Sequence, residues 1–402
     1  MSRKQKRIVS LLIIFLFLVN NTCGMFTSMV YAADIVTDGK TATTVNTSGN
    51  KTTITTGTID GDNAFNSFEK FNVAEGDEVD LYLPDGTINL INLVHKERSE
   101  INGILNSIND GKIGGNVFFL NPHGILVGKS GEINVGSLSL LTPTTVFMNN
   151  FFTADHQPSA DAVRAVLEGT VPISAGGLVT VKGRIEANND IRINAGKVEI
   201  GDIVNTDGME SEPEIIVKGN GDIVIQAKSS VDFTEIDEDE YKADEGIKSD
   251  SSIQIKGATL KAGNISLLAN AVATFDWEPS KPLQLLEGVL PAGIDELTGE
   301  EAVLSIVSAA AGIDIGSGSV LTASGQVKLE AAANTVLQWK SDTGNEAVSV
   351  GLLYSKLNTD STVTVGSGAK ITAGSLDVSA RNDSILEVKS LAHTDNKDSI
   401  AQ

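Results

Sequence analysis

Histidine is the residue type in this chain that most readily does chemistry, because it binds metals and transfers protons near neutral pH. The four histidines are His95, His123, His156 and His393, and none has the HxH or HxxxH spacing that brings two imidazoles to one metal ion. The sequence also lacks a GxSxG elbow, a P-loop and a GxGxxG motif after a strand. We therefore interpret the histidines as turn or surface residues and predict no metal site, no cofactor and no catalytic residue.

Carboxylates are the second candidates, since enzymes acting on polysaccharides use clustered Asp residues, or His with Arg, on one sheet face. Asp and Glu number 52 against 30 Lys and Arg, which gives a formal charge of −22. So acidic a chain is repelled by phosphate backbones and anionic lipid, so we expect no nucleic-acid partner. The five arginines after the N-terminal segment are dispersed, which disfavours a polysaccharide enzyme: Arg98, Arg164, Arg184, Arg192 and Arg381.

The first 32 residues have the features of a secretory signal peptide. A basic stretch at positions 3–7 precedes an apolar core, Ile8 to Val19, and the small residue Ala32 follows. We expect export through the inner-membrane translocon and cleavage between Ala32 and Ala33. The apolar core is shorter than the roughly 20 residues of a membrane span, so no integral span is expected in the mature chain. The only cysteine, Cys23, would leave with the signal.

The second half of the chain repeats a unit of short alternating runs. One copy begins Ile253-x-Ile255-x-Gly257, a second Ile313-x-Ile315-Gly and a third Val363-x-Val365-Gly, and a looser copy precedes them at residues 179–195. Strict apolar/polar alternation broken by glycine predicts half-buried strands. Repetition with coils of ~20 residues predicts an all-β parallel β-solenoid, because one coil alone cannot bury its apolar face. A β-sandwich is the alternative fold.

Three segments interrupt this pattern and are expected as extra-helical loops near residues 153–169, 232–248 and 276–303. The first contains a predicted short helix from Ser159 to Leu167, with Ser159 as N-cap and Gly169 near the C-cap. The second carries an acidic run and the third contains prolines. Surface binding often resides in such loops, although most are only tolerated insertions.

A strand–turn–strand corner lies in the first half, in the run Val117 to Gly128. Pro122 fixes φ near −65°, Gly124 accepts a positive φ, and Asn121 can hydrogen-bond its own turn. Apolar strands precede the turn at Val117 and follow it at Ile125. Taken alone, such a corner fits any β protein.

The order of motifs around this corner makes the pattern specific. Asn92-Leu93-Val94 and the run Ser99 to Leu105 precede it, and Gly131-Glu132-Ile133-Asn134 follows. In this order, residues 34–142 closely resemble the N-terminal secretion domain of two-partner secretion exoproteins, the filamentous haemagglutinin and haemolysin class. His123 stands where that family usually has Asn, and Phe65 where some members have Trp.

The resemblance implies a fold, a partner and a route. It implies a two-partner secretion domain at residues 33–150 that caps a right-handed parallel β-helix at residues 151–402. It also implies a dedicated outer-membrane β-barrel transporter, and it marks the residues needed for secretion as Asn92, Asn121, Pro122, Gly124 and Ile125.

The function implied is that of a secreted or surface-retained adhesin, which attaches to host cells through a surface or glycan ligand. The alternatives are the stalk of a larger toxin or contact-dependent inhibition protein and, least favoured, a β-helical polysaccharide enzyme.

Overall fold

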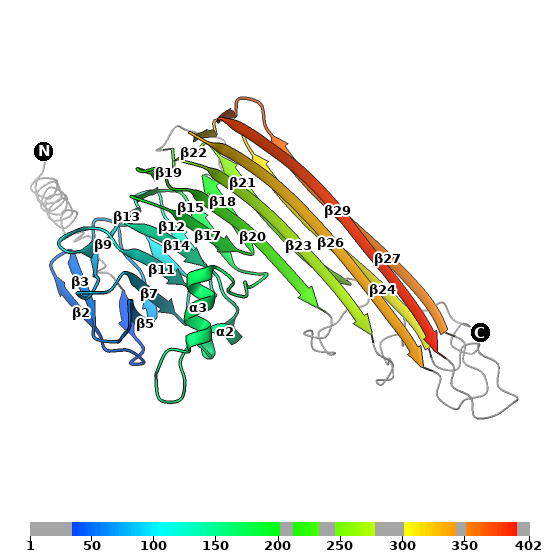
Figure 1. The fold of residues 1–402 in the computed structure, drawn as a ribbon, viewed down its shortest axis with the longest axis horizontal. Helices are drawn as coiled ribbons and strands as arrows, with labels where there is room; N and C mark the ends of the chain where they lie inside the picture. The colour runs from blue at the N-terminus through cyan, green and yellow to red at the C-terminus, as the bar shows by residue number, and fades with distance from the viewer. Residues whose placement is uncertain (1–33, 202–211, 233–245, 278–300, 343–350, 392–402) are drawn as a thin grey trace, which may run out of the picture. The chain divides into compact units, whose positions relative to one another are not determined.

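The computed structural model describes residues 34–201, 212–232, 246–277, 301–342 and 351–391. All of them belong to one compact unit, Ala33–Gln402. The predicted signal peptide and its cleavage position at Ala32 and Ala33 lie outside the described residues, as does His393. Most of the described chain is arranged as three sheets that wrap around a common core (Figure 1).

Each full coil of the chain contributes one strand to each sheet, in the order sheet A, sheet C, sheet B. Sheet A contains β1 (Ile35–Thr37), β4 (Ile59–Asp60), β5 (Asn63–Phe71), β7 (Asn89–Val94), β11 (Asn116–Leu120), β14 (Ser137–Leu141), β17 (Ile191–Ala195), β20 (Ile223–Asp232), β23 (Ile265–Trp277), β26 (Gln326–Asp342) and β29 (Ser375–Leu391). Sheet C contains β8 (Ser99–Ile101), β12 (Ile125–Val127), β15 (Leu178–Val181), β18 (Lys197–Gly201), β21 (Ile247–Lys256), β24 (Glu301–Ile315) and β27 (Gly351–Val365).

Sheet B completes each coil and has the shortest strands of the C-terminal coils. It contains β2 (Thr43–Ser48), β3 (Lys51–Thr56), β6 (Glu78–Tyr82), β9 (Ile104–Asn109), β10 (Lys112–Ile113), β13 (Glu132–Val135), β16 (Arg184–Ala187), β19 (Glu214–Val217), β22 (Thr259–Ala262), β25 (Val320–Ala323) and β28 (Lys370–Thr372). Coils pair in parallel, whereas β1 and β4 on β5, β2 on β3 and β10 on β9 pair antiparallel. The predicted all-β parallel β-helix with an N-terminal cap is therefore confirmed.

The sequence repeats stack on one another in register. Ile253 pairs with Ile313, and Ile313 pairs with Val363 in the following coil. Likewise Leu260 pairs with Leu321 in sheet B. Period-two alternation sends these side chains into the solenoid, where each row continues the same aliphatic core from coil to coil.

A second core lies on the outer face of sheet A in the N-terminal coils, under an insertion between β14 and β15. The insertion carries α2 (Thr145–Asn149) and α3 (Ala160–Glu168), drawn in green in Figure 1. The helix expected from Ser159 is confirmed as α3, and Gly169 ends it in the left-handed conformation at φ 73°. The short helix α2 was not predicted. Residues buried in this outer core come from sheet A (Phe65, Ile91, Leu93, Phe118, Leu120, Leu141) and from the insertion (Met148, Phe151, Ala162, Val163, Val166, Val171).

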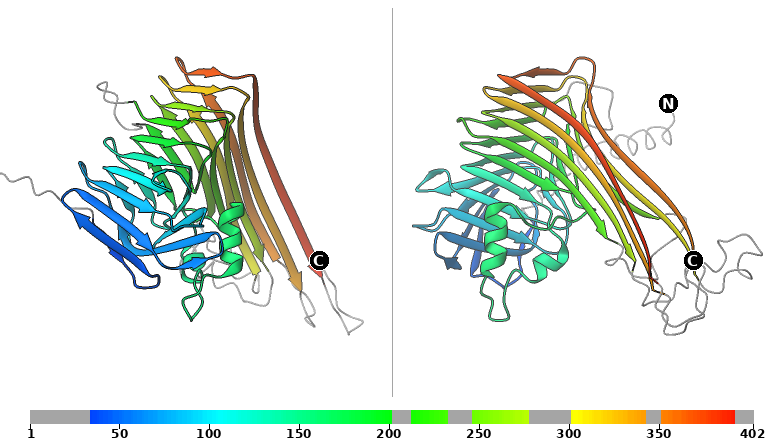
Figure 2. Two further views of the ribbon diagram at one scale, coloured as in Figure 1. Left: turned by 60° about the vertical axis from the view of Figure 1, so that its left-hand side comes forward. Right: turned by 45° about the vertical axis from the view of Figure 1, so that its right-hand side comes forward.

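The predicted coil length of ~20 residues is wrong for most of the chain. Stacked asparagines one coil apart are separated by 26 residues at Asn63 and Asn89 and by 27 at Asn89 and Asn116. Further on, hydrogen-bonded neighbours in adjacent coils are 42 residues apart at Asp222 and Asn264 and 49 apart at Thr335 and Ser384. The coils lengthen because strands of sheets A and C run far beyond the solenoid corner (Figures 1 and 2).

These long strands form a two-layer extension, which we call the long-strand region: β20, β21, β23, β24, β26, β27 and β29. Small side chains fill its interior, among them Ala271, Ala311 and Ala333, together with the hydrogen-bonded pair Ser229 and Ser249. Residues 233–245, 278–300 and 343–350, which include most of two predicted loops, lie outside the described residues.

Glycine at the corners permits the close approach of successive coils. A Cβ on Gly183 would lie 2.2 Å from the carbonyl oxygen of Gly131 and 2.3 Å from that of Gly128, so Gly183→Ala forces the backbone apart. We expect this variant to lose about 1–3 kcal/mol of unfolding free energy, as overpacking does. Gly176→Ala is the matched control, because its Cβ would meet nothing within 4 Å. Urea denaturation of the purified chain measures both, and equal midpoints would contradict the tight corner.

Candidate functional site

The predicted corner is a β-turn that joins β11 of sheet A to β12 of sheet C. The amide of Gly124 donates to the carbonyl oxygen of Asn121 at 3.2 Å, with Pro122 at the second position of the turn. Gly124 has φ 100°, and a Cβ there would lie 2.7 Å from the carbonyl oxygen of Leu178. Glycine is required twice over at this position, by the conformation and by the neighbouring coil.

Asn121 is fully buried and every polar atom of its side chain is used. Its Nδ2 donates to the carbonyl oxygen of Glu97 at 2.8 Å and to Ser99 Oγ at 2.9 Å. Its Oδ1 accepts from the amide of His123 at 2.9 Å, and its own amide donates to the carbonyl oxygen of Leu141. One asparagine therefore holds together the preceding coil, its own turn and the following coil.

Asn92 and Ile125 lie close to this turn in the stack. Ile125 is fully buried and pairs with Ser99, the residue that Asn121 contacts. Asn92 is also fully buried and pairs with Phe119, two residues before Asn121. The structure thus places Asn121, Pro122 and Gly124 in one turn, with Ile125 directly after it in sheet C and Asn92 beside β11 in sheet A.

Asn92 is the centre of a hydrogen-bonded row across the first coils. Asn66 Nδ2 donates to Asn92 Oδ1 at 3.0 Å, and Asn92 Nδ2 donates to the carbonyl oxygen of Phe118 at 3.2 Å. Thr43 of the cap donates to Asn66 Oδ1 at 2.8 Å. The row connects β2, β5, β7 and β11, so its polar groups are satisfied only when these strands are stacked.

The structure also brings together a serine, a histidine and an aspartate that were not predicted as a group. Ser67 Oγ donates to Asp38 Oδ2 at 2.7 Å, and His95 Nε2 lies 3.1 Å from Ser67 Oγ and 3.5 Å from Asp38 Oδ2. A hydrolytic triad needs the imidazole between nucleophile and carboxylate and needs an accessible serine. Here Ser67 is fully buried and bonds the carboxylate directly, so the cluster ties the cap to two coils.

This cluster can be recognised in the sequence only when the coil length is known. Ser67 and His95 are 28 residues apart, close to the spacing of adjacent coils. Burial lowers the pKa of His95, and nearby Lys40 lowers it further, while Asp38 opposes this shift and His123 adds to it. His123 itself is exposed, with Nε2 3.0 Å from the carbonyl oxygen of His95. His156 is an exposed residue at positive φ.

Within the described ranges, no group of three or more His, Cys, Asp or Glu side chains is placed to hold a metal ion. No helix found there is long and apolar enough to span a membrane.

The antiparallel cap, the parallel coils and the buried asparagine turn define a capped β-helical domain, and comparison with known proteins identifies its family. The family model of the TPS secretion domain matches residues 33–277, more than half of the chain. The chain therefore belongs to the family of two-partner secretion (TPS) domains, as the sequence motifs indicated. Among curated protein sequences, none matches significantly.

Several solved structures match the chain, among them two secretion domains. One is the filamentous hemagglutinin secretion domain, at 17% identity and a TM-score of 0.38, with 85% of this chain and 99% of that chain covered. The other is the HMW1 secretion domain from Haemophilus influenzae, at 15% identity and a TM-score of 0.33, with 90% and 99% covered.

Family membership makes the chain a two-partner secretion exoprotein. Such proteins cross the outer membrane through a partner transporter and reach the cell surface or the medium. The family consists of secretion domains of exoproteins and not of enzymes.

Replacing Asn121 by Ala removes a buried hydrogen-bonding group that three neighbours need. The carbonyl oxygen of Glu97, Ser99 Oγ and the amide of His123 all lose a partner, so we expect a loss of about 2–4 kcal/mol of unfolding free energy. His123→Asn, at the exposed turn position, is the control and should change little. Thermal and urea unfolding measure the difference, and an unchanged Asn121→Ala variant would contradict the assigned bonds.

The lowered pKa of His95 predicts that acid weakens the fold. Because the unfolded chain takes up a proton near pH 6.5 and the folded His95 only at lower pH, the unfolding free energy falls as the pH drops below about 6.5. The slope contributed by this one group is at most about 1.4 kcal/mol per pH unit. Chemical denaturation between pH 7.5 and 5.5 should show it, and His95→Gln should flatten it. A slope that His95→Gln leaves unchanged would refute the assignment.

Proposed function

We propose that Asn92, Asn121, Pro122, Gly124 and Ile125 are read by the outer-membrane transporter while the chain is still unfolded. The observation that supports this is burial: Asn92, Asn121 and Ile125 are fully buried in the folded coils. A transporter cannot touch such side chains after folding. Recognition of an extended segment by strand addition to an open sheet edge fits the apolar strands on both sides of the turn.

Folding on the outer side then favours onward transport. Each coil that stacks removes apolar surface from water, at about 25 cal/mol per Å². The inward rows of Val, Ile and Leu supply this area coil by coil. Back-sliding into the transporter requires the last coil to unstack, so folding outside biases the chain outward without a nucleotide.

We further propose that the secreted chain attaches to surfaces as an adhesin. The long-strand region supports this, since strands of 15 and 17 residues in β24, β26, β27 and β29 present broad, regular outer faces. Large exposed sheet surfaces suit binding to cells or glycans better than they suit catalysis, which needs an enclosed site. The stalk of a larger toxin is the second candidate function.

Secretion in a two-plasmid strain tests the transporter proposal. We expect release into the medium only when the outer-membrane partner is co-expressed, and at least tenfold less release from Asn121→Ala/Pro122→Ala. Because that variant also destabilises the turn, Gly183→Ala serves as a control that weakens a corner outside the secretion residues. Equal losses in both variants would show that stability alone matters, and equal release from all strains would sink the proposal.

Attachment is tested separately with the purified chain. Fluorescently labelled protein should bind cultured epithelial cells or abiotic surfaces saturably, and unlabelled protein should compete. Binding no greater than that of an unrelated acidic protein of similar size would contradict the adhesin proposal and favour the stalk function.

A further inference from the structure

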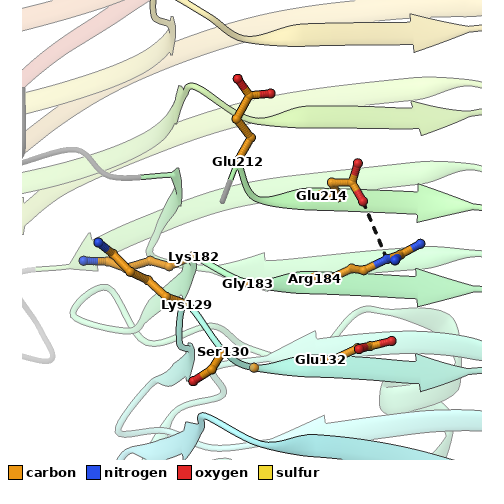
Figure 3. A pocket seen from close by; sticks show the side chains of 9 residues that line it. Lys129, Ser130, Glu132, Lys182, Gly183, Arg184, Glu212 and Glu214 are labelled. Atoms are coloured by element: carbon orange, nitrogen blue, oxygen red, sulfur yellow. Dashed lines mark ion pairs between the residues drawn. The ribbon is translucent and has the colours of Figure 1, made fainter. Parts of the chain in front are cut away.

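The contact between successive coils has three parts in the middle of the solenoid. The backbones pair in parallel, as those of β13, β16 and β19 do in sheet B. Inward aliphatic side chains stack, so that Ile185 lies on Ile215 and both are fully buried. Outward side chains pair where their charges allow, and Figure 3 shows Arg184 beside Glu214 of the following coil, with Nε 3.6 Å from Oε2.

The last described coil is open on one side. It consists of β27, β28 and β29, which pair with β24, β25 and β26, and no other described strand pairs with them. Its inward aliphatic side chains are about half exposed, although each stacks on a fully buried residue of the coil before. The exposed residues are Val365 at 48%, Leu376 at 54%, Val378 at 50% and Leu386 at 58%, on Ile315, Val327, Leu329 and Leu337. A sheet edge beside exposed aliphatic side chains is a surface on which another strand can pair.

The opposite end of the solenoid is closed by the cap. Its outermost strands are short or polar, since β1 has 3 residues and β2 reads Thr-Thr-Val-Asn-Thr-Ser. The apolar side chains beneath them are covered, and Ile54, Phe68 and Phe71 are fully buried. Short and polar edges protect a sheet from pairing with another chain. The open coil therefore finds no matching surface at the cap, which disfavours head-to-tail stacking into a filament.

The open coil is stepped, because β27 and β29 lie at different heights along the solenoid. The hydroxyl oxygen of Thr359 in β27 lies 2.8 Å from that of Thr335 in β26 and 2.7 Å from that of Ser384 in β29. Since Thr335 and Ser384 pair in neighbouring coils of sheet A, β27 lies level with the space between those two strands. Strand β29 therefore projects beyond β27 by about half of the 4.8 Å strand spacing.

We propose that two copies of the chain stack end to end through this coil, with β29 of each copy paired to β27 of the other. A two-fold axis along the strands places each projecting strand on a recessed one, and their lengths of 17 and 15 residues match. The interface uses the same face of both copies, so assembly ends at two. The inference stands apart from the adhesin proposal, because stacking needs no host ligand.

The two faces match in apolar character and in size. Leu376 and Val378 begin β29, while Val363 and Val365 end β27, so both pairs lie beside sheet B, and the two-fold axis brings each pair to the other pair in the second copy. A strand of 17 residues spans about 56 Å, and two packed layers cover about 20 Å. The resulting area of roughly 1,100 Å² exceeds the roughly 800 Å² that each partner buries in a stable interface.

Analytical ultracentrifugation of the purified chain at micromolar concentration tests the proposal. We expect a dimer, and Val378→Lys should weaken dimerisation at least tenfold, because it places a charge in the inward row of the open coil. The matched control is Ile385→Lys in the same strand. Ile385 is 49% exposed, like Val378, but it pairs with Val336 on the outer face of sheet A, so this variant should dimerise as the parent does.

Four outcomes would overturn the inference. A monomeric parent would refute stacking, and a larger assembly would contradict its two-fold closure. Equal effects of Val378→Lys and Ile385→Lys would place the contact on another surface. A chain that dimerises only after residues 392–402 are removed would assign the open coil to that segment. Urea midpoints of both variants exclude a folding defect as the cause, and a monomeric chain that still binds cells refutes only the stacking.

Discussion

The structure depends on one constraint: a coil has no core of its own. Its inward side chains are covered, and its strands hydrogen-bonded, only by the coils above and below. The polar residues inside obey the same rule, since Asn92 and Asn121 find their partners in neighbouring coils. The glycines at the corners follow from it as well, because a Cβ at position 183 would collide with the backbone of Gly131 in the preceding coil. The packing of the core, the buried hydrogen bonds and the glycines at the corners thus all result from coil stacking.

The N-terminal coils, unlike the later coils, must also cover apolar side chains on the outer face of sheet A. Strand β11 is apolar on both faces, with Phe119 inside the solenoid and Phe118 outside it. The outer face is covered by the insertion, in which Phe151 packs 6.2 Å from Phe65 between ring centroids. Phe65, at a position where some relatives have Trp, is fully buried there. The insertion is therefore part of the fold of these coils and not a peripheral loop.

Sequence patterns predicted what is local and periodic. The repeats beginning at Ile253, Ile313 and Val363 gave the strands and their stacking, because alternation with glycine punctuation specifies both. The long strands escaped prediction because Ala and Ser, as at Ala271 and Ser249, fill their inward positions and do not read as an apolar period. The outer core was not predicted because a strand that is apolar on both faces shows no alternation of apolar and polar residues.

The asparagine turn and the hydrogen bond of Asn121 within it were predicted, but its hydrogen bonds to the preceding coil were not. Its partners Glu97 and Ser99 lie more than twenty residues upstream, at a separation set by the coil length. The Ser67–His95 contact was missed for the same reason. A better estimate of the coil length, from the recurring Asn63, Asn89 and Asn116, would have aligned these residues in advance.

Coil stacking also sets when the five residues proposed for transporter recognition become hidden. The amide of Asn121 needs the carbonyl oxygen of Leu141, and Ile125 needs Val179 beside it in sheet C. Both partners lie downstream, with the whole helical insertion between them. Until β14 and β15 emerge, the turn lacks its next coil and Phe118 lacks its cover. On the proposed route, the segment that is apolar on both faces therefore stays available for strand addition until the coil that follows it has been exported.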